Sequence, residues 1–445
     1  MDSTVHAARI LMGDSLGFHI IFVLMGLTLP ILVSWFELTG IVRKDQRFIN
    51  VAKFWSKIMA LLVITGVVSG TIIALQMSLV WPGILKFGGE VIGLPFMFET
   101  YAFLIEATFL ALYLRTWGKV KPMVHWLFSL MIIVGSTLSA YAITSVNAWM
   151  NYPSGFDYIS GKIENVNVWA AMFSRTSIVE FVHSMPGYYL SAALIIAGMY
   201  AFRIARSAYT KRTSKNHEMD WFIIKRLMLF AGVMFILSGI TADITGKYLA
   251  KYEAVKLAAI ELNYTTRNNA PLTVGGVGRE DGTIVGPHFE IPGALSLLAG
   301  NSTDAAVEGL NVTPKDQRPP LFVHTLFDVK MTLVNILMVL IPGYFVVYAA
   351  RRKWLQTRPV LYLIGISGFI GIAIVELGWM LTEIGRQPWA VRGFVTTEEA
   401  FTKSDSVTVY GYAFPIAYVL LFFATFYAIK RLVAAEKSKK GGTLS

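Results

Sequence analysis

Nine long apolar runs recur along this 445-residue chain, and 55% of its residues are hydrophobic. Each run has the roughly 20 residues that a helix needs to cross a bilayer. Lipid offers the backbone no hydrogen-bond partners, so only helices or closed barrels can span it, and these runs are too long for barrel strands. The sequence therefore predicts an all-α polytopic membrane protein with nine transmembrane helices, at about residues 14–38, 55–80, 94–115, 124–149, 177–203, 221–246, 327–349, 359–381 and 409–430.

Basic residues gather in alternate loops. The first loop holds Arg43, Lys44, Arg47, Lys53 and Lys57, whereas the segment 81–93 holds only Lys86. Because cytoplasmic loops are rich in Lys and Arg, the N-terminus is predicted outside and the C-terminus in the cytoplasm. The net charge of +11 follows from this topology and does not point to nucleic acid as a partner.

Four segments follow from these spans. Residues 1–246 would hold helices one to six, 247–326 an external loop, 327–430 the last three helices and 431–445 a cytoplasmic tail. The external loop is polar and too long for a simple connector, so it is either a functional lid or a disordered linker. The first apolar run lacks a basic start and a small-residue cleavage site, which favours a retained helix over a signal peptide.

Five candidate ligands come from five different spans: His19, Glu99, His183, Met331 and Glu383. With the N-terminus outside, all five fall in the outer third of the membrane. Ionisable groups are costly in lipid, so their presence there predicts a functional site.

Two further polar residues lie elsewhere in the spans. Glu106 follows Glu99 by seven residues on the same helix face and reaches deeper. His125 lies at the inner end beside Lys121, and we predict that it is only a hydrogen-bonded buried residue.

Haem is one group that such ligands could hold. Its iron takes His, Met and other axial ligands, and a haem that reacts with oxygen also needs an open position and a proton route. Cysteine is absent, which excludes disulfides, thiolate metal sites, iron–sulfur clusters and c-type haem attachment. The small residues of Gly66–Thr71 would let a macrocycle or a neighbouring helix approach closely.

One short string identifies a family. Gly385-Arg386-Gln387-Pro388-Trp389, preceded by Glu383, resembles the string after the eighth span of subunit I in the cytochrome bd family of quinol oxidases. Supporting matches are Gly66–Thr71, Glu99 and Glu106, the segment 180–183 and the segment 256–261, so that the resemblance runs from residue 19 to residue 389.

The resemblance implies three haems, b558, b595 and d, and no copper. His183 and Met331 would be the axial pair of low-spin haem b558. His19, Glu99 and Glu383 would be ligands or near-ligands of the high-spin haems b595 and d, and which residue holds which haem stays open. Trp379, Arg386 and Trp389 would belong to the haem environment.

The resemblance also implies a reaction and partners. Lys256 and Glu261 would act in quinol oxidation at the external loop, which matches the family's shorter form. Glu99 and Glu106 would carry cytoplasmic protons to oxygen, so that a membrane potential forms without pumping. The implied partners are subunit II, a single-helix small subunit, quinol, oxygen and the lipid of a prokaryotic cell membrane.

One departure from the family concerns the methionine ligand. The family often reads Phe-Arg-x-Met, whereas this chain has Phe327-Asp328-Val329-Lys330-Met331, and Met338 is a second candidate.

Two other functions fit these residues less well. A haem–copper oxidase needs about six membrane histidines, but only seven histidines exist here and several lie outside the spans. An ion- or proton-coupled transporter could use the intramembrane acids, although the inverted repeats and broken helices typical of that class are missing.

Overall fold

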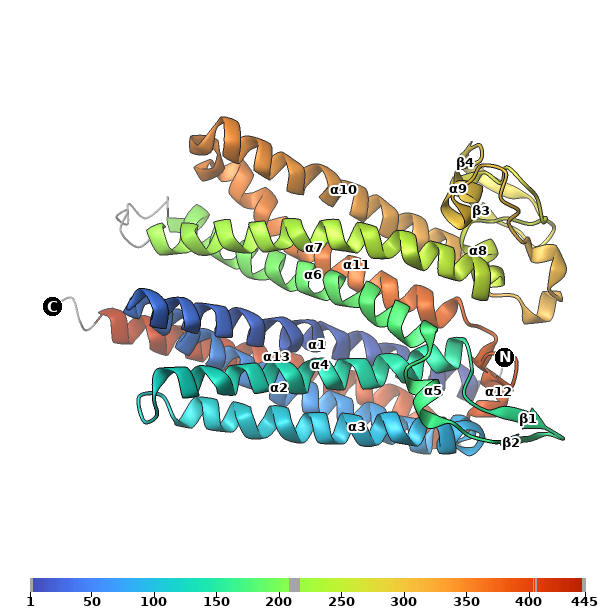
Figure 1. Cartoon of the computed structure of the whole chain (residues 1–445), viewed down its shortest axis with the longest axis horizontal. Coiled ribbons are helices and arrows are strands. Elements are labelled where there is room, and N and C mark those ends of the chain that lie inside the picture. The colour runs from blue at the N-terminus through green and yellow to red at the C-terminus, as the bar shows by residue number, and fades with distance from the viewer. Residues whose placement is uncertain (1–2, 208–216, 403, 405, 442–445) are drawn as a thin grey trace. The chain divides into compact units, whose positions relative to one another are not determined.

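The computed structural model of the chain describes residues 3–207, 217–402, 404 and 406–441 (Figure 1). Within these ranges, nine helical segments are long and apolar enough to cross a membrane, which confirms the predicted number. The last four residues of the predicted tail lie outside the described ranges.

The helices that form these segments are α1 Ser3–Arg43, α2 Gln46–Leu79, α3 Pro82–Arg115, α4 Pro122–Asn151, α6 Arg175–Ser207, α7 His217–Tyr252, α10 Phe322–Ala350, α11 Arg358–Ile384 and α13 Ser406–Gly441. The short helices are α5 Val168–Met172, α8 Ala254–Ile260, α9 Ala294–Gly300 and α12 Thr397–Ala400, with 3₁₀ turns η2 Leu310–Val312, η3 Lys315–Gln317 and η4 Arg352–Gln356. The strands are β1 Asp157–Ile159, β2 Lys162–Glu164, β3 Leu272–Gly278, β4 Ile284–Ile291, β5 Trp389–Val391 and β6 Val395–Thr396.

Most of these helices extend past the predicted apolar runs. Helix α3 begins at Pro82, whereas the apolar run predicted a start near residue 94. Proline is favoured at the first helical position because its missing N–H has no partner there anyway. Hydropathy marks the lipid-facing part of a helix, while caps mark its ends.

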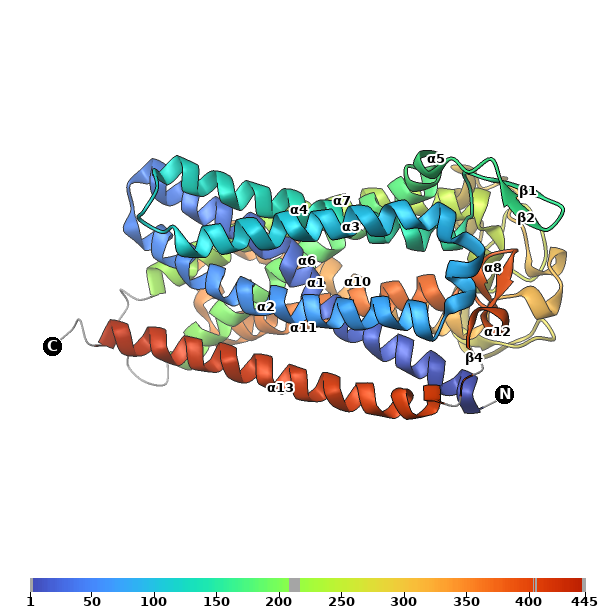
Figure 2. The same cartoon turned by 90° about the horizontal axis from the view of Figure 1, so that it is seen from below.

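The chain divides into two compact units. The first contains α1–α4, the β1–β2 hairpin, α5 and α13, and Figure 2 shows α13 running beside α2. In this unit Gln76 Nε2 donates to Ser15 Oγ at 2.7 Å, and Thr65 Oγ1 lies 2.8 Å from Thr425 Oγ1. Such buried polar pairs join helices from distant parts of the chain.

The second unit contains α6–α11 and the segment that links α7 to α10. Helix α6 packs closely on α11 because glycines line the contact. A Cβ at Gly368 would lie 2.8 Å from Ile195 Cα, and Ser191 Oγ donates to Gly371 O at 2.9 Å. Small residues allow this close approach between membrane helices.

The predicted external loop is folded, so it is not a disordered linker. It holds α8, α9 and an antiparallel β3–β4 hairpin, with Leu272 opposite Ile291. The hairpin has a bulge near Gly275 and Gly276, where both φ angles are +81° and glycine is therefore favoured. Figure 1 shows these elements together at one end of α7 and α10.

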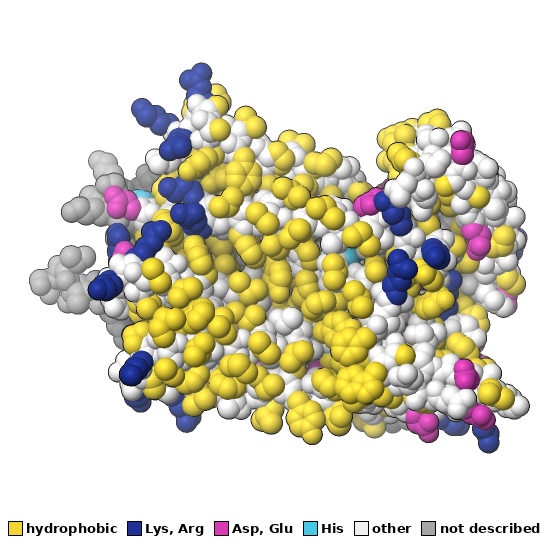
Figure 3. Space-filling model, viewed as in Figure 1, with side chains coloured by type: hydrophobic (Ala, Val, Ile, Leu, Met, Phe, Trp, Pro, Cys, Tyr) yellow, Lys and Arg dark blue, Asp and Glu magenta, His cyan; other side chains and the backbone are white. Residues whose placement is uncertain are grey.

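Apolar side chains cover the long helices. Figure 3 shows them along the helices of each unit, with Lys and Arg side chains at helix ends. Examples of exposed apolar residues are Ile236 on α7, Phe369 on α11 and Phe423 on α13. This distribution is the one that a lipid environment favours.

A buried polar cluster lies at the end of unit one where α3 meets α4. His125 Nδ1 is 2.6 Å from Glu37 Oε1, and its Nε2 is 2.9 Å from Tyr113 O. Tyr113 donates its hydroxyl to Glu37 Oε2 at 2.7 Å. All three side chains are buried. The prediction that His125 is a hydrogen-bonded buried residue is confirmed.

Replacing His125 with Phe should destabilise the protein, because the buried carboxyl group of Glu37 would keep only the Tyr113 hydroxyl as a partner. Such a loss typically costs about 3–5 kcal/mol. Thermal unfolding of the detergent-purified single variant should show a lower Tm than the wild type. The double variant His125→Phe, Glu37→Leu should recover part of the lost Tm. An unchanged Tm for the single variant would contradict this account.

Candidate functional site

His183 of α6 is held in one orientation by Thr241 of α7. Its Nδ1 lies 3.3 Å from Thr241 Oγ1, and that hydroxyl donates to Leu237 O at 3.0 Å. Since the threonine proton is used on its own helix, the histidine N–H must be on Nδ1. The lone pair of Nε2 then remains for a metal, which is how most metal-binding histidines are arranged.

His19 of α1 has the same arrangement in the first unit. Its Nδ1 lies 2.9 Å from Ser69 Oγ on α2, and Ser69 donates to Thr65 O at 3.0 Å. A Cβ at Gly70 would lie 3.1 Å from His19 Cε1. The small residues of the Gly66–Thr71 run therefore make room for this imidazole ring.

These two histidines fit the haem that the resemblance implies. Each keeps Nε2 available on a ring whose other nitrogen is fixed by a hydroxyl of the neighbouring helix. Haem iron takes neutral imidazole in this way.

The acids Glu99 and Glu106 both lie on α3 of the first unit. Glu106 is 6% exposed, and Glu99 is half-buried. Helix α4 approaches α3 closely at this level, since a Cβ at Gly135 would lie 2.8 Å from Glu106 N. The seven-residue spacing puts both carboxyl groups on one face of α3, as predicted.

The end of α11 carries Glu383 in an ion pair. Arg386 Nη2 donates to Glu383 Oε2 at 2.6 Å, while Arg386 Nε and Nη1 have no hydrogen-bond partner among the described residues. One turn earlier, Trp379 Nε1 donates to Glu376 Oε2 at 2.6 Å. Glu376 was not among the site residues predicted from the sequence.

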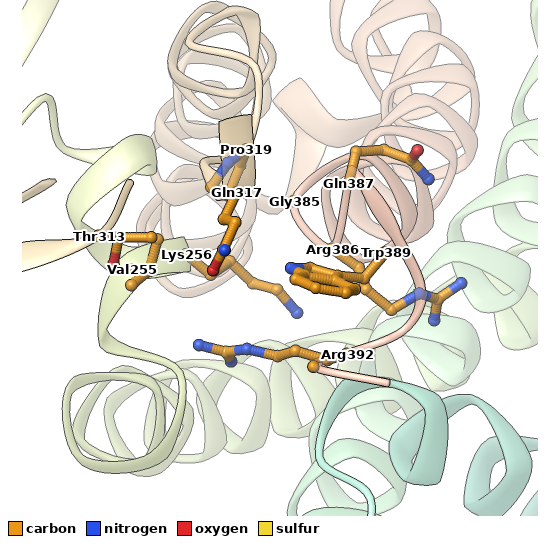
Figure 4. Close-up of a pocket in the computed structure, with 11 residues that line it drawn as sticks. Val255, Lys256, Thr313, Gln317, Pro319, Gly385, Arg386, Gln387, Trp389 and Arg392 are labelled. Atoms are coloured by element: carbon orange, nitrogen blue, oxygen red, sulfur yellow. The ribbon is translucent and has the colours of Figure 1, made fainter. Parts of the chain in front are cut away.

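A cavity of about 220 Å³ lies beside the Gly385–Trp389 string. Lys256, Arg386, Trp389 and Arg392 contribute to its lining, and Figure 4 shows Lys256 and Arg392 extending into the space beside Trp389. The structure thus brings together three of the predicted site residues. Arg392 was missed, although it follows the string by three residues.

Lys256 of α8 is buried and contacts two polar side chains. Its Nζ donates to Asn151 Oδ1 at 2.6 Å and forms an ion pair with Glu253. A Cβ at Gly385 would lie 3.1 Å from Lys256 Cγ, so glycine there gives the lysine side chain room. Asn151 is a site residue that only the fold reveals, whereas Glu253 lies three residues before Lys256 and could have been found from that spacing.

Glu261 lies at the other end of α8 and does not line this cavity. The residue is 1% exposed, and both carboxyl oxygens lack a hydrogen-bond partner in the described part of the chain. Burial, and secondarily the negative charge of Asp328, raise the pKa of Glu261 to about 8. This group can therefore gain or lose a proton near neutral pH.

His324 connects α10 to the folded segment. Its Nδ1 lies 2.6 Å from Ile260 O, and its Nε2 lies 3.0 Å from Gly275 O. Asp328, whose carboxylate also accepts from Gly275 N at 2.7 Å, lies 3.2 Å from Nε2. The pair anchors the β3–β4 hairpin.

Met331 lies on α10 with its side chain 36% exposed. Trp389 begins strand β5, after a cis peptide between Gln387 and Pro388.

Comparison with known proteins gives one family. Residues 7–437 match the model of cytochrome bd terminal oxidase subunit I. The chain is 33% identical over 433 residues to a putative cytochrome bd menaquinol oxidase subunit I of Bacillus subtilis, covering 96% of each. It is also 27% identical to a cytochrome bd ubiquinol oxidase subunit 1 of the same organism, covering 95% of this chain and 93% of the relative.

A solved structure agrees with these relatives. The bd oxidase from Geobacillus thermodenitrificans superposes with a TM-score of 0.90 at 35% identity, covering 97% of this chain and 99% of the other.

The chain therefore belongs to the cytochrome bd terminal oxidase subunit I family. It is a multi-pass subunit of a prokaryotic membrane oxidoreductase that uses haem cofactors. This assignment sets aside the transporter and haem–copper alternatives.

Changing His324 to Gln should loosen the β3–β4 hairpin, because one of two buried carbonyl groups loses its donor. A carbonyl group left without a donor costs about 1–3 kcal/mol of stability. The amide protons of the hairpin should therefore exchange with solvent about ten-fold faster or more. Hydrogen exchange measures this directly. His288 on β4 is exposed, and His288→Gln is the matched control. Equal exchange in both variants would show that His324 is not the anchor.

Proposed function

We propose that this chain is the haem-bearing subunit of a quinol:oxygen oxidoreductase that works with a second large subunit. The relatives named as menaquinol and ubiquinol oxidases support this choice of substrate. In this structure the proposal is supported by His19 and His183. The contacts of their Nδ1 atoms with Ser69 and Thr241 leave the Nε2 lone pair of each ring available to a metal. A single-helix small subunit completes the proposed assembly.

The cofactors proposed are haems b558, b595 and d, without copper. His183 would hold b558 together with a side chain of α10, for which the sequence predicts Met331. His19, Glu99 and Glu383 would contribute to the high-spin haems, with Trp379 and Trp389 in their environment. When bound, the haems would supply electron transfer from quinol and the binding and reduction of oxygen.

The quinol headgroup would dock in the cavity lined by Lys256, Arg392 and Trp389. An indole offers an aromatic face to a quinol ring, and the cationic side chains offer donors to its oxygens. Lys256 is already fixed by Asn151 and Glu253, so it would bind a quinol oxygen with little loss of side-chain freedom.

Glu261 would accept a proton that quinol releases. Because Glu261 does not line the cavity and neither of its carboxyl oxygens has a partner among the described residues, we propose that water carries the proton to it. With the N-terminus outside and the C-terminus in the cytoplasm, this proton would leave at the outer face. Glu106 and Glu99 would pass cytoplasmic protons toward oxygen. Charge separation of this kind builds a membrane potential without pumping.

A spectrum of the purified two-subunit complex tests the function. We expect haem bands in the reduced-minus-oxidised difference spectrum and oxygen consumption with quinol. His183→Ala should lose the low-spin bands, whereas His288→Ala, at an exposed position, should keep all of them. A wild-type complex without haem bands would contradict the proposal.

The quinol reaction should depend on pH through Glu261. A base acts only when deprotonated, so with a pKa of about 8 its active fraction rises as the pH increases through 8. We expect turnover with quinol to rise over this range. Glu261→Gln should remove the rise and lower turnover about 10²-fold. Glu290→Gln, at an exposed hairpin position, is the control. A wild-type rate and pH profile in Glu261→Gln would exclude the role.

A further inference from the structure

Arg392 stands in a tight turn that fixes its backbone beside the cavity. The turn joins β5 to β6, and in it Phe394 N donates to Val391 O at 3.0 Å. Gly393, at the third position of this turn, has a φ of +77°, which favours glycine. Arg392 N also donates to Met150 O at 3.0 Å. The backbone thus sets the direction of the side chain, which extends into the cavity (Figure 4).

The guanidinium group of Arg392 lacks an acceptor of its own. Its Nη1 is buried and has no hydrogen-bond partner among the described residues. The acid that approaches it is Glu253, whose Oε2 lies 3.9 Å from Nη1 and already forms an ion pair with Lys256. A buried donor without an acceptor costs about 1–3 kcal/mol, and more when it is charged. Such a group at a cavity points to a ligand.

The lining of the cavity carries positive charge only. Its charged residues are Lys256, Arg386 and Arg392, and no Asp or Glu of the described chain lines it. The segment that precedes α10 contributes neutral side chains, among them Thr313 and Gln317. A cleft lined by charges of one sign attracts the opposite sign, so the cavity favours a ligand with an anionic oxygen.

The acids behind the lining belong to other cations. Glu253 is the partner of Lys256, and the acid at the end of α11 is the partner of Arg386. Glu180 of α6 is surrounded by the charges of these residues, but no ion pair between Glu180 and Arg392 is found within the described ranges. Arg392 therefore shares its acid with Lys256 and keeps its positive charge available to a ligand.

We propose that Arg392 is a catalytic residue of quinol oxidation and that its guanidinium group holds one quinol oxygen as an anion. This inference rests on the proposed function, which places quinol in this cavity. A phenolic hydroxyl has a pKa of about 10, so about one quinol in a thousand is ionised at pH 7. An opposite charge within about 4–6 Å favours the anion by about 10- to 1,000-fold.

The reaction then separates into two balanced steps. The O–H bond of one hydroxyl group breaks, and its proton passes through water to Glu261, while the oxygen stays against Arg392. The anion next gives two electrons to the proposed haem cofactors, and the second hydroxyl group releases its proton to water at the outer face. An anion loses an electron more readily than neutral quinol does, so a larger share of anion speeds the oxidation.

A quinol analogue that cannot be oxidised tests this in the purified two-subunit complex, held in nanodiscs of neutral lipid. The probe is a fluorinated phenol with a prenyl tail, whose ¹⁹F chemical shift reports the ionisation of its hydroxyl group. Bound to the wild type, the phenol should ionise at a pH about one unit or more below its value in nanodiscs without protein.

Variants at position 392 assign the effect. Arg392→Gln should return the ionisation of the phenol to its value without protein and weaken binding of the ionised form about ten-fold or more. Arg392→Lys keeps the charge and should retain most of the effect. The methyl ether of the probe cannot ionise, so it should bind equally to the wild type and to Arg392→Gln. Quinol turnover should fall about ten-fold in Arg392→Gln while the haem bands stay unchanged.

Lys315→Gln is the matched control. Lys315 is exposed and does not line the cavity, although it belongs to the segment that precedes α10. Its replacement removes the same charge from the protein as Arg392→Gln does. The ionisation of the bound phenol and the turnover with quinol should both stay at their wild-type values.

Several results would overturn the proposal. One is a phenol that ionises on the wild type as it does without protein. Another is the same lowered value in Arg392→Gln, which would assign the effect to Lys256 or Arg386. Loss of haem bands in Arg392→Gln would make the guanidinium group a partner of a haem carboxylate. Displacement of the phenol by phosphatidylglycerol would make the cavity a site for a lipid phosphate.

Failure of the proposed docking site has a different result. In that case neither the phenol nor its methyl ether would compete with quinol for the wild-type complex. If only the inference about Arg392 is wrong, both probes would still compete with quinol, and the phenol would bind without the shift in its ionisation.

Discussion

The contacts between a histidine and a hydroxyl group on the neighbouring helix are the constraint on which the rest of this structure depends. In each unit a Ser or Thr bonds a carbonyl of its own helix and fixes Nδ1 of a histidine on the next one. Within lipid, neither group can turn to water instead. The neutral tautomer and the direction of Nε2 are therefore set before any cofactor arrives, which reduces the cost of ordering the ligand.

The folded segment between α7 and α10 depends on a second set of buried polar contacts. His324 holds the hairpin and the end of α8, while Asn151 and Glu253 hold Lys256. Two nitrogens of Arg386 and both carboxyl oxygens of Glu261 have no hydrogen-bond partner in the described part of the chain, which is costly unless a ligand or water reaches them. Because Arg386 lines the cavity, its nitrogens point to a binding region there.

Much of this could be predicted from the sequence. The number of spans follows from apolar run length, and the Gly385–Trp389 string correctly indicated the family. The buried state of His125 was also predicted. The division into two units was not, because hydropathy shows which residues face lipid and not which helices pack together. Asn151 is 105 residues from Lys256 in the chain, so only the fold relates the two, whereas Glu253 lies three residues before Lys256 and Arg392 three residues after the string.

Met331 shows another limit. Residue type predicts that it is a ligand, because methionine binds haem iron, but residue type does not say how far a side chain is buried, and Met331 is 36% exposed. The ion pair of Glu383 with Arg386 likewise depends on a turn whose geometry the residue letters do not give.

A high-resolution electron cryo-microscopy map of the complete complex in lipid tests most directly whether Nε2 of His183 and of His19 face haem. The account predicts porphyrin density with iron bonded to Nε2 of His183 and a haem beside Nε2 of His19, while Nδ1 of each ring stays bonded to its hydroxyl. Water or protein side chains at those two nitrogens, in a map that resolves them clearly, would contradict it.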